Sequence, residues 1–274
     1  MEISTAPSAQ EFLARTAQFR AREPYLTNVM GSVAVGVVEG RAYDSCHWWI
    51  AEDAGDVVGA AIRTAPYNVL IAPMSADVNA AIAQAVADVF PELPGLSGPL
   101  HQADAFIEVL QPRTVVRTMD ETVYVLDALR AGIAEGHARR AQPSDEELLS
   151  AWIYDFLVEA GMPLHNPQAG VKRLLEVGWL WEVDGTPVSM CSYAVPVGEP
   201  GHVVGRIGPV YTPLEYRRRG FAGAVTSRAI QELQTQCDHV MLYADSANPA
   251  SNGVYQRIGF VEHARTGQLA FEYA

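Results

Sequence analysis

The sequence predicts an α/β protein in which a mixed sheet with flanking helices occurs twice in tandem. Both halves show the same order of patterns: two helical segments, a hairpin that starts with aromatic residues, a further strand, a helix and closing strands. The length of 274 residues is enough for two ordinary domains, and a hydrophobic content of 49% is enough for packed cores. We expect one domain over 1–135 and a second over 136–274.

The first half opens with two helical patterns, over 6–22 and 25–40. Aromatic and β-branched residues then predict three strands, over 47–51, 57–64 and 69–72. An Asp-Ala-Gly-Asp turn joins the first two strands in a hairpin. The remainder predicts a helix over 75–90, a loop over 91–99, a helix over 101–110 and a strand over 122–126.

Residues 131–144 contain glycine, proline and charge without a sustained apolar period, which predicts a linker. A capping-box pattern at Ser144–Glu147 starts the next helix, and another helix follows Pro167. A hairpin is then expected across Asp184-Gly185. The later elements are strands over 202–211 and 239–244, helices over 222–233 and 249–258, and closing strands over 260–265 and 269–273.

A basic, glycine-containing turn separates the strand over 202–211 from the helix over 222–233. The first amides of a helix have no internal acceptor, and the helix dipole places partial positive charge there. We therefore interpret the segment from Arg217 to Gly223 as a cradle for a pyrophosphate, with arginines adding charge at its rim. A solvated basic turn before a glycine-started helix would explain the same pattern.

A second motif follows about twenty residues later. Asn248 has the properties of a helix N-cap, and Pro249 suits the first helical position. Asn252 and Tyr255 follow on one face of this short helix, and Gly259 ends it. Capping and aromatic packing alone could account for each residue, but the combination with the cradle favours a site.

The two motifs together resemble those of the GNAT superfamily of acyl-CoA-dependent N-acyltransferases. The matching pieces are RRRGFA at 217–222 and NPASNGVYQRIGF at 248–260, in that order, and the resemblance covers about 145–274. It implies acetyl-CoA or another acyl-CoA as the donor co-substrate. The first half lacks both motifs, with APMSA at 72–76 in place of the first. We interpret it as a degenerate domain of the same topology.

The resemblance also implies roles for individual residues. The amides of 218–223 would bind the pyrophosphate, and the backbone of 210–212 would pair with the pantetheine arm and stabilise the oxyanion. Asn248 or Asn252 would bond the cofactor, and Tyr255 matches the position that protonates the departing thiolate. The candidate cofactor-binding residues are Val210, Tyr211, Thr212, Arg217, Arg218, Arg219, Gly220, Phe221, Ala222, Gly223, Asn248 and Asn252.

The general base is less well defined. An alkyl ammonium has a pKa of about 10.4, so a base, a water chain or desolvation must remove its proton. Many relatives have a glutamate on the cradle strand, but 206–212 contains no carboxylate. Glu182 on the preceding hairpin is the first candidate, although an exposed strand charge is the favoured explanation for it. His202, Asp245, Glu215 and a water-mediated path are the other candidates.

Four aromatic side chains are candidates for the wall of an acceptor pocket, with core packing as the favoured explanation for each: Tyr154, Trp179, Trp181 and Tyr193.

Composition narrows the class of partner. The net charge of −13 makes nucleic acid an improbable general partner and would attract a cationic amine. The three cysteines, Cys46, Cys191 and Cys237, are far apart, so we expect free thiols and no metal. Without a leader pattern or a membrane-spanning apolar run, the expected location is cytoplasmic, with no membrane partner.

The favoured function is therefore a cytoplasmic N-acetyltransferase for a small-molecule amine, with Tyr255 as general acid. The alternative is a non-catalytic protein that binds or senses acyl-CoA. Acetylation of a protein tail is a third option, and a homodimer is possible.

Overall fold

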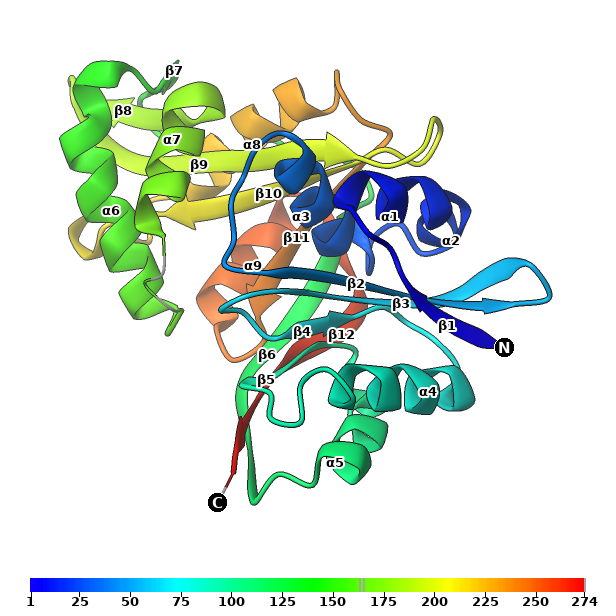
Figure 1. Ribbon diagram of the computed structural model, residues 1–274. Coiled ribbons are helices and arrows are strands. Elements are labelled where there is room, and N and C mark those ends of the chain that lie inside the picture. Colours follow the sequence, from blue (N-terminus) through cyan, green and yellow to red (C-terminus); the bar gives the residue numbers. More distant parts are fainter. Residues whose placement is uncertain (163, 165, 274) are drawn as a thin grey trace. The chain divides into compact units, whose positions relative to one another are not determined.

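The computed structural model describes residues 1–162, 164 and 166–273, and contacts divide it into two compact units (Figure 1). Unit 1 consists of Met1–Val123, Val197–Val203 and Ala264–Ala274. Unit 2 consists of Tyr124–Pro196 and Val204–His263. Neither unit is continuous in sequence, whereas the predicted domains meet at a single boundary between 135 and 136.

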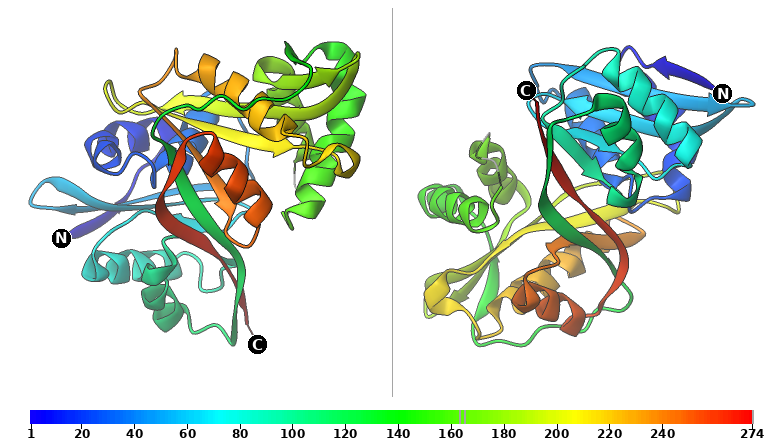
Figure 2. Two further views of the ribbon diagram at one scale, coloured as in Figure 1. Left: turned by 180° about the vertical axis from the view of Figure 1, so that it is seen from behind. Right: turned by 90° about the horizontal axis from the view of Figure 1, so that it is seen from below.

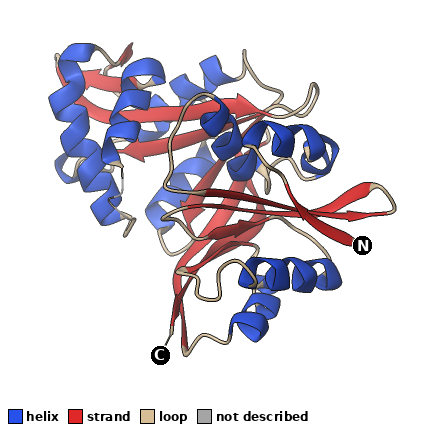
Figure 3. Cartoon of the chain, viewed as in Figure 1, coloured by secondary structure: helices blue, strands red, loops and turns tan. Residues whose placement is uncertain are grey.

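Most of unit 1 alternates strands and helices along the first half of the chain (Figure 3). Its strands, in sheet order, are β1, β2, β3, β4, β5, β12 and β6. The elements of the first half are β1 (Glu2–Thr5), α1 (Ala9–Arg15), α2 (Ala17–Arg22), α3 (Asn28–Val38), β2 (Cys46–Asp53), β3 (Asp56–Thr64), β4 (Val69–Ile71), α4 (Ala76–Ala87), β5 (Gly95–Gly98), α5 (Asp104–Leu110) and β6 (Thr114–Leu126).

Unit 2 repeats this order of elements. Its strands, in sheet order, are the end of β6, then β11, β10, β9, β8 and β7. The elements are β7 (His137–Arg140), α6 (Glu146–Glu159), α7 (Pro167–Val177), β8 (Trp179–Val183), β9 (Thr186–Val197), β10 (Val204–Tyr211), α8 (Phe221–Leu233), β11 (His239–Asp245), α9 (Pro249–Arg257) and β12 (Phe260–Glu272).

Alternation along the strands gives the sheet of unit 2 two buried faces. Trp179 and its partner Cys191 face the core that contains α8, whereas Leu180 and Met190 face the core that contains α6 and α7. Successive strand residues point to opposite faces, so one apolar run fills both cores. Unit 1 uses the same device in β2, where Trp49 faces α4 and α5 and its neighbours face α1 and α3.

The closing strands are shared between the two halves of the sequence. Residues Gly267–Ala270 of β12 pair antiparallel with β5 and belong to unit 1. The end of β6, from Tyr124, belongs to unit 2, where β6 lies next to β11 in the sheet order. Figure 2 shows β6 and β12 running side by side.

Several predicted elements differ in extent from the observed ones. The first helical pattern is divided at Thr16, and β12 is one strand where two were expected. Three strands fall where none was predicted: β1, β5 in the expected loop over 91–99, and β7 in the expected linker. These segments are short or poor in β-formers, and pairing with β2, β12 and β8 makes them strands.

Candidate active site

The site begins where β10 leaves its parallel neighbour. The register between β10 and β11, as the structure describes it, joins Val204–Arg206 to His239–Met241, whereas β10 continues to Tyr211. Gly208 has a φ of 137° and precedes a cis Pro209, which has no N–H to donate to a strand. The half-buried segment Gly208–Val210 therefore lies beyond the last described pair between β10 and β11.

The start of α8 provides the predicted cradle. Arg218 and Gly220 both have left-handed backbone, with φ values of 64° and 88°. No side chain caps Gly220, and no hydrogen bond joins the amides of Phe221, Ala222 and Gly223 to any described residue. Because the dipole adds positive charge at these amides, the turn is chemically suited to a phosphate group.

The three arginines of the turn have different surroundings. Arg217 donates from Nε to the Thr212 carbonyl (2.8 Å) and from Nη2 to Glu159 (2.5 Å), so its guanidinium ties the end of β10 to α6. Arg219 lies 4.8 Å from the Phe221 ring centre and 3.6 Å from Glu135. Arg218 is exposed and has no ion pair with any described residue, which leaves its charge for a ligand.

The two asparagines first of all shape the turn before α9. The Asn248 side chain caps the helix by accepting from the Ser251 amide (3.1 Å), as predicted for an N-cap. Asn252 donates to the carbonyls of Asp245 (3.0 Å) and Asn248 (2.8 Å). Its Oδ1 is buried and accepts no hydrogen bond from a described residue, so it has capacity to accept one from a ligand.

Tyr255 packs on the same core as Val210, with its ring 6.1 Å from that of Phe260 and 6.4 Å from that of Tyr124. Burial raises the pKa of the Tyr255 phenol above its usual value, and the nearby Cys191 thiol raises it further. The phenol is therefore protonated at neutral pH, as an acid must be before it donates. No hydrogen bond joins it to any residue that the structure describes.

Glu182 lies on β8, two strands from β10 in the sheet order. Its carboxylate binds Nε of Arg139, and the same guanidinium binds Asp145 through two bonds of 2.7 and 2.9 Å. This arrangement accounts for Glu182 as one member of a charged cluster at the β7–β8 edge. The arginine at its centre is a residue that the sequence patterns did not single out.

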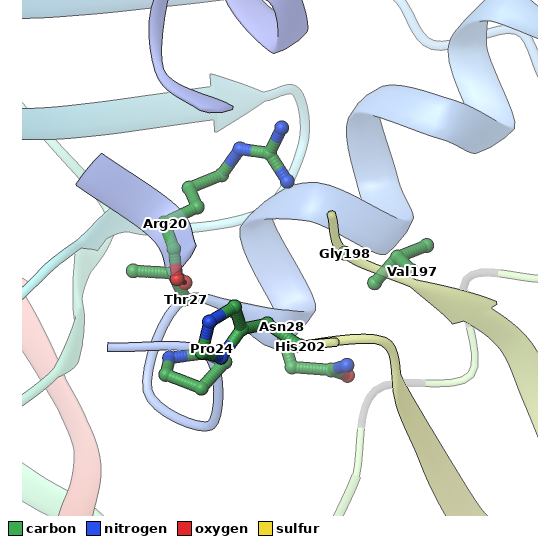
Figure 4. Close-up of a pocket in the computed structure, with 7 residues that line it drawn as sticks. All are labelled: Arg20, Pro24, Thr27, Asn28, Val197, Gly198 and His202. Carbon is green, nitrogen blue, oxygen red and sulfur yellow. Dashed lines mark hydrogen bonds between the residues drawn. The ribbon is translucent and has the colours of Figure 1, made fainter. Parts of the chain in front are cut away.

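The other base candidates are dispersed. Asp245 accepts from the Ala247 amide (2.8 Å), and Glu215 is an exposed residue of the short turn before the cradle. His202 belongs to unit 1, where it lines a small cavity with room for about one water molecule (Figure 4). That cavity is lined by Arg20, Pro24, Thr27, Asn28, Val197, Gly198 and His202.

The aromatic candidates for an acceptor pocket separate into buried and exposed groups. Trp179 and Tyr193 are buried in the core beneath α8, and the Trp181 indole donates to the Glu135 carbonyl (2.7 Å). Tyr154 on α6 remains exposed. Tyr211, which was predicted for its backbone, also donates its hydroxyl to Glu159 (3.2 Å); burial and nearby carboxylates raise its pKa to about 12.

The corresponding helix start in unit 1 is occupied by the chain itself. The Met74 amide donates to the side chain of Gln102 (3.3 Å). Asp77 in the first turn of α4 accepts from Ser75 (2.5 Å), and hydrogen bonds from this hydroxyl and from the amides of Asp77 and Val78 lower its pKa. A carboxylate already lies where an incoming phosphate would bind.

No helix in the described part of the chain is both long and apolar enough to cross a bilayer. Across residues 1–162, 164 and 166–273, no three His, Cys, Asp or Glu side chains are placed to hold a metal ion.

Comparison with known proteins relates this geometry to a family. Residues 201–268, which include β10, the cradle, β11 and α9, match the model of the FR47-like protein family. Among curated proteins, no match to the sequence was found. The structural relatives described next are all below 20% sequence identity.

Whole-chain similarity to solved structures is extensive. An acetyltransferase of the GNAT family from Colwellia psychrerythraea is similar with a TM-score of 0.60 at 13% identity, covering 100% of both chains. A tandem GNAT protein from the clavulanic acid biosynthesis pathway gives 0.57 at 12%, covering 98% of each chain. A GCN5-related N-acetyltransferase from Sphaerobacter thermophilus gives 0.55 at 17%, covering 97% of this chain and 94% of the other.

The fold is therefore that of solved GNAT acetyltransferases, and one of the similar structures is described as a tandem GNAT protein. The resemblance predicted from the two motifs and the α/β fold class are both confirmed.

Proposed function

We propose that unit 2 is an N-acyltransferase that uses acetyl-CoA or another acyl-CoA and acylates the amine of a small molecule. The observation that carries this proposal is the uncapped start of α8, where the amides of Phe221–Gly223 and the guanidinium of Arg218 have no partner among the described residues. The GNAT fold supports acetyl transfer as the general activity.

The donor would be held by backbone more than by side chains. Amides from Arg218 through Gly223 would bind the pyrophosphate, with the exposed guanidinium of Arg218 beside it. The pantetheine arm would pair along Val210–Thr212, where β10 has passed its last described pair with β11. Oδ1 of Asn252 is an acceptor for an amide of that arm. Arg217, by contrast, would position the end of β10 through Thr212.

The reaction would be a direct transfer. The neutral amine nitrogen attacks the thioester carbonyl, and a backbone amide of 210–212 stabilises the oxyanion. The carbon–sulfur bond then breaks, and the Tyr255 hydroxyl gives its proton to the thiolate. The amine loses one proton and Tyr255 regains one from solvent, so charge and protons balance.

The route of the amine proton is proposed to run through water. Glu182 is paired with Arg139 and Asp245 with its own turn, so neither is presented as an unpaired base. Asp155 and Glu159 on α6 raise the pKa of Tyr211 through their charge, which places negative potential close to the end of β10. Such potential would attract a cationic acceptor before it is deprotonated.

Calorimetric titration with acetyl-CoA tests donor binding. We expect micromolar affinity for the parent protein and its loss in Gly220→Glu, because a carboxylate would meet the phosphates. Gly220→Ala is the matched control, since it introduces the same left-handed strain without charge. Absence of binding by the parent protein would refute the donor assignment.

Turnover of Tyr255→Phe separates an enzyme from the alternative, a protein that only binds or senses acyl-CoA. For an enzyme, kcat with a responsive amine should fall by about 10²–10⁴-fold while the acetyl-CoA Kd stays the same. Binding without turnover in the parent protein across an amine screen would favour the sensor.

A further inference from the structure

The segment 127–136 overlaps the linker predicted over 131–144, yet hydrogen bonds fasten it to α8, to β8 and to the end of α9. The amides of Asp127 and Arg130 donate to the carbonyls of Gly259 (3.1 Å) and Ile258 (2.9 Å) at the end of α9. At its other end, the Glu135 carbonyl accepts from the Trp181 indole (2.7 Å). All these residues belong to unit 2.

The middle of the segment lies directly on the first turn of α8. The Gly132 amide donates to the Ser227 hydroxyl (2.9 Å). A Cβ at Gly132 would lie only 2.5 Å from the Gly223 carbonyl carbon and 2.7 Å from the Ala224 nitrogen. The segment therefore touches the backbone of the cradle, with no side chain between them.

Ile133 stands at the rim of the cradle with its side chain in solvent. It is 93% exposed, the highest value among the exposed large hydrophobic residues of the described chain. Its carbonyl oxygen is 3.0 Å from the position that a Cβ on Gly220 would occupy. A β-branched apolar side chain is thus held in water beside the uncapped amides, in a segment that is fixed on both sides.

We propose that Ile133 is a donor-binding residue that packs against the adenine ring of coenzyme A. This inference rests on the proposed function. The pantetheine arm would leave the pyrophosphate toward β10, so the nucleotide would leave on the side away from it. The turn offers two exposed arginines for the nucleotide phosphate, Arg218 and Arg219, and Ile133 supplies the apolar surface for the base.

The test compares two probes, coenzyme A and 4′-phosphopantetheine, which lacks the adenosine. In Ile133→Ser, the Kd for coenzyme A should rise about tenfold, and in Ile133→Trp it should fall, because a base stacks well on an aromatic ring. The Kd for 4′-phosphopantetheine should stay within about twofold in both variants. Val261→Ser is the control, since Val261 is another exposed apolar residue of unit 2, 51% exposed.

Unchanged affinity for coenzyme A, or an equal change for both probes, would overturn the role of Ile133 and leave the proposed function standing. A parent protein that binds neither probe would overturn both. Since Ile133 buries almost no surface, Ile133→Ser should melt at the temperature of the parent protein.

Discussion

The guanidinium of Arg139 holds two carboxylates, those of Glu182 and Asp145, and their hydrogen bonds raise its pKa. Removing one carboxylate would leave charge unbalanced in a partly buried cluster. We expect Glu182→Gln to lower the free energy of unfolding by about 1–3 kcal/mol in urea titrations while kcat changes little.

Asp145→Asn is the matched variant for this prediction, because Asp145 shares the arginine but was never a candidate base. Similar losses of stability in both variants would identify the cluster as structural. If only Glu182→Gln lost turnover, with its pH profile displaced, Glu182 would be the base.

His47 gives unit 1 a dependence on pH. Its ring stacks on Trp49 and meets the edge of Phe90, with centroid separations of 5.6 and 4.8 Å. Burial lowers the pKa of His47, and the charge of Arg63 lowers it further. Folding therefore favours the neutral ring, and the unfolded chain binds the extra proton once the pH falls below about 6.5.

The contribution of His47 to the free energy of unfolding should therefore be complete above pH 6.5. It should decrease as the pH falls toward the lowered pKa that His47 has in the folded protein. Urea titrations at pH 7.5 and 5.5 measure this loss. His47→Gln should lose less stability over the same interval, and identical losses in the two proteins would contradict the assignment.

At the scale of elements, α8 depends on a glycine that lies outside it. Any side chain at Gly132 would collide with the backbone at Gly223, which cannot move without disturbing the cradle. We expect Gly132→Ala to destabilise the protein by about 1–3 kcal/mol and to weaken acetyl-CoA binding.

Gly253→Ala is the comparison for that variant. Its new Cβ would contact only the flexible end of the Arg257 side chain (3.1 Å). The free energy of unfolding should therefore stay the same or rise slightly, because alanine favours a helix more than glycine does. If the parent protein and Gly132→Ala had the same melting temperature, the segment 127–136 would be able to move away from α8 and relieve the clash, which would contradict the prediction.

Elements with strong local signals could be predicted from the sequence. Asp184 and Gly185 both have positive φ, as their hairpin turn requires, and Asn248 caps α9. The strand β7, with the sequence His-Ala-Arg-Arg, has no such signal and exists because β8 pairs with it.

In the site, too, features set by adjacent residues could be predicted from the sequence, and contacts between distant residues could not. The cradle turn depends on adjacent residues and has the expected form at Gly220, whereas its roles in binding remain predictions. The partners of Arg217 and Glu182 lie 58 and 43 residues away, at Glu159 and Arg139. Spacing along a sequence carries no information about such contacts.

At the scale of the whole molecule, the units and the halves of the sequence do not coincide. A fragment of residues 136–274 would lack Tyr124, which is 1% exposed in the core of unit 2, and the segment that lies on α8. It would keep residues 264–274, whose strand partner β5 is in the other half.

We expect this fragment to be unfolded by circular dichroism when produced alone. Co-expression with 1–135 should restore a folded, co-purifying pair, because the exchanged strands would then have their partners. A soluble 136–274 fragment with a cooperative melting transition would contradict this expectation.

The exchange of closing strands also bears on how such a protein can evolve. After a gene duplication, one copy is normally free to be deleted, or to be recombined into another gene. In this protein, loss of either half would leave an unpaired strand edge in the half that remains, and such an edge promotes aggregation. The N-terminal half therefore has a structural role of its own, because its strand β5 pairs with the closing strand β12 even though Asp77 lies at the start of its helix α4.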